Sequence, residues 1–148
     1  MSLAKYKSKR NLKKSGEPKA KIKKLKSKKL IYLIHEHHAS HLHWDLRLEM
    51  NGVLKSWAVP KQPPTAKAEK RLAIEVEDHP LSYANFKGII PEGNYGAGKV
   101  EIWDKGNYEL KNKDAKKIEI ILHGKKLHGD YVLIKTGYAR NSWLFFKV

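Results

Sequence analysis

Cysteine is absent from the 148 residues of this sequence. Disulfide bonds and thiolate metal sites are therefore excluded, and any bound metal ion must be held by histidine, aspartate or glutamate. No apolar run approaches the roughly 18 residues that a membrane-spanning helix needs, and the lysine-rich first residues lack the apolar segment of a secretory signal. We therefore expect a cytoplasmic protein with no membrane partner.

Acidic residues are scarce, since 15 Asp and Glu stand against 31 Lys and Arg, and the formal net charge is +16. This excess favours nucleic acid as the partner, because neutralising phosphates releases their counterions. Residues 1–30 contain 13 of the cations and one acid, Glu17. Such a segment cannot bury a core, so we predict a flexible basic arm over residues 1–30 and one domain over residues 31–148. The arm could equally be a solubility tail or a non-specific tether.

Long amphipathic helices are also missing from the pattern, whereas alternation of apolar and polar residues is frequent. Residues 42–50 alternate with period two, Asn51-Gly52 is a strong hairpin signal, and residues 53–59 form the predicted return strand. Residues 80–98 are predicted to form a long loop. Further strands are predicted at residues 72–77, 99–103, 108–111, 117–122, 131–135 and 143–148. Many short strands separated by turns favour a β-barrel or a β-sandwich.

Histidines are concentrated in one place, because five of the eight lie between His35 and His43. His35 and His37 share one face of a predicted strand, and His43, Asp45 and Arg47 share one face of the next. If the two strands pair, both polar rows lie on the same side of the sheet. Two imidazoles and a carboxylate suit Mn²⁺, Zn²⁺ or Fe²⁺ with open coordination positions, and a nearby arginine suits a phosphate. Histidines on a polar face can also simply bind water or a carboxylate, and the pattern alone leaves both interpretations open.

Three long motifs make the sequence recognisable. In order, they are HHASHLHWDLRLEMNGVLKSWAVPK at residues 37–61, RLAIEVEDHPLSY at residues 71–83 and IPEGNYGAGKVEIWD at residues 90–104. Together they resemble the signature of the 3′-phosphoesterase module, which in bacteria is fused to DNA ligase D and also occurs alone in archaea and bacteria. The resemblance covers essentially the whole chain and is weakest in the first few residues and beyond about residue 111.

The resemblance implies a mostly β fold, a closed or partly closed antiparallel β-barrel with few short helices. It implies a manganese-dependent 3′-phosphodiesterase and 3′-phosphomonoesterase, with other divalent transition metals as alternatives. Such enzymes remove 3′-terminal ribonucleosides and 3′-phosphates from DNA or DNA/RNA primer-template ends, and leave a 3′-OH for repair. Which DNA ligase, or which polymerase and Ku repair system, would be the partner is left open.

The family's functional residues carry over onto matching positions of this sequence. The implied metal ligands are His37, His43 and Asp45. The implied catalytic residues, which contact the scissile phosphate or line its pocket, are Arg47, Arg71, His79 and Tyr83. The implied phosphate or nucleic-acid contacts are Arg10, Glu17, His35 and Lys61.

Two positions depart from the family pattern: Asn11 stands where the family usually has Asp, and His35 stands where it often has Gln. These departures concern the balance between the diesterase and monoesterase steps. The main alternative function is a non-catalytic basic β-barrel that binds nucleic acid, and another is a metallohydrolase of small molecules. A simple binder would present aromatic platforms, whereas here the polar face of the strand carries histidine and aspartate.

Overall fold

The computed structural model describes residues 29–94 and 96–148. The predicted basic arm, with Arg10 and Glu17, lies almost wholly outside the described residues. One short 3₁₀ helix, η1 (Leu81–Asn85), accompanies the strands in the described part. The strands are β1 (Leu30–His38), β2 (Leu42–Met50), β3 (Val53–Val59), β4 (Lys70–Pro80), β5 (Gly88–Ile90), β6 (Gly98–Lys113), β7 (Lys117–His123), β8 (His128–Lys135) and β9 (Ser142–Lys147). No helix within residues 29–94 and 96–148 is long and apolar enough to cross a membrane.

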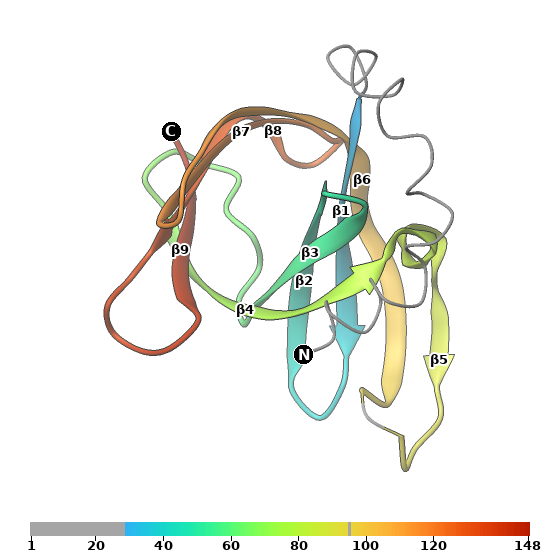
Figure 1. Cartoon of the computed structure of the whole chain (residues 1–148). Coiled ribbons are helices and arrows are strands. Elements are labelled where there is room, and N and C mark those ends of the chain that lie inside the picture. The colour runs from blue at the N-terminus through green and yellow to red at the C-terminus, as the bar shows by residue number, and fades with distance from the viewer. Residues whose placement is uncertain (1–28, 95) are drawn as a thin grey trace.

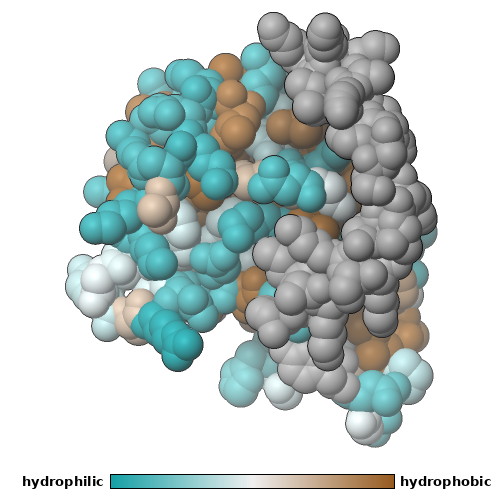
Figure 2. All heavy atoms as spheres, viewed as in Figure 1, coloured by the Kyte–Doolittle hydropathy of each residue, from teal (hydrophilic) through white to brown (hydrophobic). Residues whose placement is uncertain are grey.

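The strands form a closed antiparallel barrel (Figure 1). Their order is β1-β2-β3-β4-β9-β8-β7-β6, and a further pairing between β1 and β6 closes the circle, while β5 adds to the edge of β6. The predicted mostly β fold, with a closed barrel and few short helices, is confirmed. In the view of Figure 2, hydrophilic residues cover most of the described surface.

The hairpin between β2 and β3 follows the prediction residue by residue. Asn51 and Gly52 both have positive φ, 48° and 83°, as a tight two-residue turn of the type I′ class requires. The turn fixes the register, so that Arg47 lies opposite Ser56. This hairpin therefore places the Arg47 side chain of β2 and the Ser56 side chain of β3 on the same face of the sheet.

Two parts of the predicted strand pattern are wrong. The strands predicted at 99–103 and 108–111 are one strand, β6, and the predicted loop at 80–98 contains η1 and β5. The polar segment inside β6 is held by tertiary contacts: Asp104 is buried and accepts a hydrogen bond from the Tyr32 hydroxyl at 2.7 Å. Gly106 allows β7 to approach closely, because a Cβ there would lie 2.1 Å from the His123 carbonyl oxygen.

Alternation along the first strands divides their side chains between the barrel interior and its outer face. The interior core includes Tyr32, Ile34, Leu46, Leu48 and Trp57, among other buried residues. A second, smaller cluster lies under η1 and comprises Leu33, Leu54 and Ala84, with Ile31, Leu81 and Tyr83 packed against it. η1 therefore packs over the outer face of β1 and β3, beside the row of His35 and His37.

Candidate metal centre

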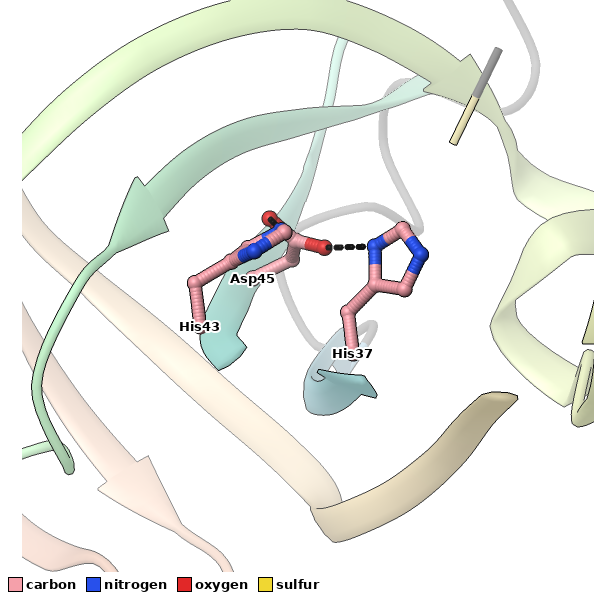
Figure 3. A group of neighbouring side chains, drawn as sticks. All are labelled: His37, His43 and Asp45. Carbon is pink, nitrogen blue, oxygen red and sulfur yellow. Dashed lines mark ion pairs between the residues drawn. The ribbon is translucent and has the colours of Figure 1, made fainter. Parts of the chain in front are cut away.

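The predicted pairing of the two histidine-bearing strands is confirmed. In the antiparallel register of β1 and β2, His37 lies opposite His43 and His35 lies opposite Asp45. Directly opposed residues in a sheet point to the same face. The side chains of His37, His43 and Asp45 accordingly converge on the outer face of the barrel (Figure 3).

The three converging side chains form a group of metal-ligand size, called the His–His–Asp group below. One ligand atom from each of His37, His43 and Asp45 lies within 4.8 Å of the others. The His43 Nε2 to Asp45 Oδ1 distance is 3.3 Å, and the His37 Nδ1 to Asp45 Oδ2 distance is 3.7 Å. Two imidazoles and one carboxylate on one face can hold a divalent transition metal and leave coordination positions open.

Backbone carbonyls orient both imidazoles for such a role. His37 Nε2 lies 2.8 Å from the Gly96 carbonyl oxygen, and His43 Nδ1 lies 3.1 Å from the His41 carbonyl oxygen. A carbonyl only accepts, so each of these nitrogens donates its hydrogen. The nitrogens that face Asp45, His37 Nδ1 and His43 Nε2, carry the lone pairs once each ring is neutral, and a bound metal ion would then take the place of a proton between them and Asp45. Metal-binding histidines are oriented in the same way, by donation from the second ring nitrogen to a carbonyl or carboxylate.

The electrostatics of the group favour a cation at its centre. Contact with the Asp45 carboxylate raises the pKa of His43 above its ordinary value, even though burial acts in the opposite direction. Burial alone would raise the pKa of Asp45, but its contacts with His37 and His43 and the nearby charge of Arg47 hold it well below the usual range. Asp45 therefore stays ionised near neutral pH, and the donor set fits a bound metal ion.

Arg47 is buried next to the group and is held from several sides. Its Nη2 lies 3.5 Å from Asp45 Oδ2, and its Nη1 donates to Ser56 Oγ at 2.8 Å. Its Nη1 also lies 3.2 Å from His79 Nδ1, and its Cζ lies 4.9 Å from the centre of the Tyr83 ring. A guanidinium fixed in this manner is preorganised to stabilise negative charge on a phosphoryl oxygen.

His35 holds the Arg47 guanidinium in place through a hydrogen bond. Arg47 Nε donates to His35 Nδ1 at 2.9 Å, and His35 Nε2 donates to the Phe86 carbonyl oxygen at 2.9 Å. Burial, and then the charge of Arg47, lower the pKa of His35 to about 4, so the ring is neutral near pH 7. Both ring nitrogens are engaged and the residue is fully buried. The structure therefore places His35 as an orienting partner of Arg47, without a ring nitrogen for the phosphate contact that the resemblance implied.

His79 reaches the group from the end of β4. Burial and the neighbouring Arg47 lower its pKa to about 4, so the ring is neutral near pH 7. Its ring centre lies 4.8 Å from that of Tyr83, which in turn stacks on Phe86 at 4.9 Å. Tyr83 of η1 and Phe86 after it thus place two stacked aromatic rings beside Arg47.

Arg71 and Lys61 are not part of this cluster. Arg71 Nε donates to the Gln62 carbonyl oxygen at 2.7 Å, and its Nη2 lies 3.7 Å from Glu69 Oε1. Lys61 is exposed and adjoins Gln62 in the chain. Arg71 therefore anchors the segment that carries Lys61. The structure brings together seven of the predicted site residues: His35, His37, His43, Asp45, Arg47, His79 and Tyr83.

Ser56 and three backbone carbonyls, those of His41, Phe86 and Gly96, escaped the sequence-based prediction. Ser56 is fully buried, accepts from Arg47 and donates to the Leu54 carbonyl oxygen at 3.1 Å. The hairpin at Asn51-Gly52 could have revealed it, because a two-residue turn places Ser56 opposite Arg47. The carbonyls of Phe86 and Gly96 had no signal, because they come from the segment that was predicted as a loop.

The described residues contain one other group of metal-ligand geometry, formed by Glu36, His38 and Glu101. Its members are already paired: His38 Nε2 lies 3.0 Å from Glu36 Oε2, and Lys99 Nζ lies 3.0 Å from Glu101 Oε2. His38 and Glu101 are exposed, whereas Asp45 is buried, so the His–His–Asp group is the stronger candidate.

A closed barrel that carries a His–His–Asp group and a buried arginine on its outer face defines a candidate phosphoesterase. Residues 35–135 match the family model of the DNA ligase D 3′-phosphoesterase domain, and the chain belongs to this family. Membership supports a hydrolase of this class.

Relatives agree with the family match. The chain is 43% identical over 98% of its length to the multifunctional non-homologous end joining protein LigD of Pseudomonas aeruginosa, and covers 18% of that protein. It is 48% identical over 96% of its length to the protein of the same name from Mycolicibacterium smegmatis, of which it covers 20%. It is 46% identical over 96% of its length to the LigD protein of Mycobacterium tuberculosis, of which it covers 19%. The chain thus spans about a fifth of the length of these relatives.

Proposed function

We propose that the chain is a metal-dependent phosphoesterase that processes the 3′ ends of DNA. It removes 3′-terminal ribonucleosides and 3′-phosphates and leaves a 3′-OH. The observation that carries the proposal is the orientation of His37 and His43, whose second ring nitrogens converge on Asp45 beside the buried Arg47. Mn²⁺ is the proposed metal because the family resemblance implies it, and the two imidazoles and one carboxylate suit a divalent transition metal.

Each residue of the site has a distinct task in this proposal. His37, His43 and Asp45 would hold the metal ion, which when bound supplies Lewis-acid polarisation of a phosphoryl oxygen. Arg47 stabilises the negative charge that develops on the phosphoryl oxygens, and its contacts with His35 and Ser56 keep it in position. His79, kept neutral by burial and by Arg47, contacts the scissile phosphate as a neutral hydrogen-bonding group.

DNA ends in a repair system are the proposed substrate. The relatives are named as non-homologous end joining proteins, and family membership supports a role in end processing during DNA repair. The net charge of +16 suits a polyanionic substrate. A DNA ligase, or a polymerase together with Ku, would use the 3′-OH that the reaction leaves.

A labelled primer-template with either a single 3′-ribonucleotide or a 3′-phosphate tests this function. With Mn²⁺ we expect both ends to be converted to 3′-OH, and with a chelator in place of the metal we expect no conversion. Binding without conversion in Mn²⁺ would favour the non-catalytic nucleic-acid-binding alternative. Conversion that persists in chelator would show that the reaction needs no metal ion.

A further inference from the structure

The connection between β8 and β9 presents an aromatic ring to solvent. This connection, residues 136–141, projects from the barrel in Figure 1. Tyr138 is 83% exposed, which makes it the most exposed large apolar side chain within the described part of the chain. An exposed aromatic ring on a basic protein is a candidate stacking platform for a nucleobase.

The connection is held in place by its own hydrogen bonds. Thr136 N donates to the Ser142 carbonyl oxygen at 2.8 Å, and Ser142 N donates to the Ala139 carbonyl oxygen at 3.3 Å. Tyr138 N donates to Thr136 Oγ1 at 3.3 Å, and Asn141 adopts a positive φ of 61°. The tyrosine is therefore exposed on a defined turn, and little ordering is needed before a ligand can stack on it.

The turn that carries Tyr138 has two exposed cations, and Glu75, whose backbone bonds the turn, is itself paired with Lys55. Residues 135–142 contain Lys135 and Arg140, both exposed, and no acidic residue. Lys135 N donates to the Lys116 carbonyl oxygen at 2.8 Å, so the lysine-rich turn between β6 and β7 lies next to this connection. Cations beside an aromatic ring suit a nucleotide, because the cations can bind its phosphate while the ring stacks on its base.

β4 connects this turn to the candidate metal centre. Glu75 N donates to the Asn141 carbonyl oxygen at 2.8 Å, which places the turn beside β4. His79 lies four residues further along the same strand, or about 13 Å at 3.3 Å per residue. β4 therefore joins the turn that carries Tyr138 to the candidate metal centre.

We propose that Tyr138 stacks on a nucleobase of the DNA strand whose 3′ end lies at the His–His–Asp group, upstream of that end. The inference rests on the proposed function and deepens it, because it adds a contact to the substrate strand away from the reacting phosphate. Base stacking on an aromatic ring tolerates any sequence, which suits an enzyme that must accept arbitrary ends.

The test measures DNA binding by the full chain with fluorescence anisotropy in chelator, using a single strand with a 3′-phosphate. We expect Tyr138→Ala to weaken binding about tenfold, which is within the range for loss of one stacked base, and Tyr138→Phe to bind like the wild type. Leu110→Ala, which removes a 42% exposed side chain on β6, is the matched control and should have no effect.

A series of strands with one abasic site at successive positions locates the contact. An abasic site at one position upstream of the 3′ end should weaken wild-type binding and leave binding by Tyr138→Ala unchanged. Equal binding by Tyr138→Ala and wild type, or a loss that no abasic position reproduces, would overturn the proposal. Because binding in chelator needs no turnover, this proposal can fail while Mn²⁺-dependent cleavage by the wild type still supports the proposed function.

Discussion

Replacing His43 with alanine is expected to abolish turnover on both 3′-phosphate and 3′-ribonucleotide ends while the barrel stays folded. The His43 side chain is 25% exposed at the rim of the group, so its loss leaves no buried cavity. It nevertheless supplies one of the three nitrogen and oxygen donors that converge on the proposed metal. Even changes around a metal ligand cost about 10–100-fold in affinity or activity, and removal of the ligand itself should cost more than that.

Metal titration and single-turnover kinetics on the same variant test this result. His128→Ala is the matched control, because His128 is an exposed histidine on β8, away from the His–His–Asp group. Its metal affinity and rate should equal those of the wild type. Cleavage by His43→Ala near the wild-type rate, with Mn²⁺ still bound, would show that His43 is not a ligand.

Arg47→Ala should keep the metal and lose turnover. Asp45 retains its contacts with His37 and His43 in this variant, so the donor set survives. Removal of one preorganised donor to a developing charge typically costs about 10²–10³ in rate. Arg47→Lys, which keeps a charge but loses the planar fork, should restore only part of the rate.

Two readouts separate a chemical role of Arg47 from a structural one. Equilibrium metal titration should be unchanged, whereas a collapse of metal affinity would make Arg47 a structural support of Asp45. Histidine NMR titration should show the pKa of His35 and His79 rising from about 4 toward the ordinary value, because the charge of Arg47 contributes to lowering both. Burial remains the larger cause, so the rise is expected to be partial.

Local sequence patterns predicted the part of the structure that depends on neighbouring strands. The period-two alternation of residues 42–50 and the turn at Asn51-Gly52 gave both strand limits and register. The same alternation predicted that the polar rows of the two histidine-bearing strands share a face if the strands pair, but the register that sets His37 opposite His43 came only with the structure. Residues that are positioned by the pairing of adjacent strands could therefore be predicted from the sequence.

Contacts between distant segments could not be predicted in this way. β6 continues through Asp104 and Gly106 because both residues contact other strands. In the sequence alone, an aspartate followed closely by a glycine is typical of a turn. His35 looked like a ligand-facing residue, but η1 and the Phe86 carbonyl cover it. Arg71 shares a motif with His79 and yet binds the segment after β3.

Anomalous diffraction from crystals of the full chain grown with Mn²⁺ tests the metal site most directly. The structure predicts a manganese peak bonded to His37 Nδ1, His43 Nε2 and the Asp45 carboxylate, with His37 Nε2 still donating to Gly96. A peak at the group of Glu36, His38 and Glu101 alone, or manganese bound through the opposite ring nitrogens, would contradict the account.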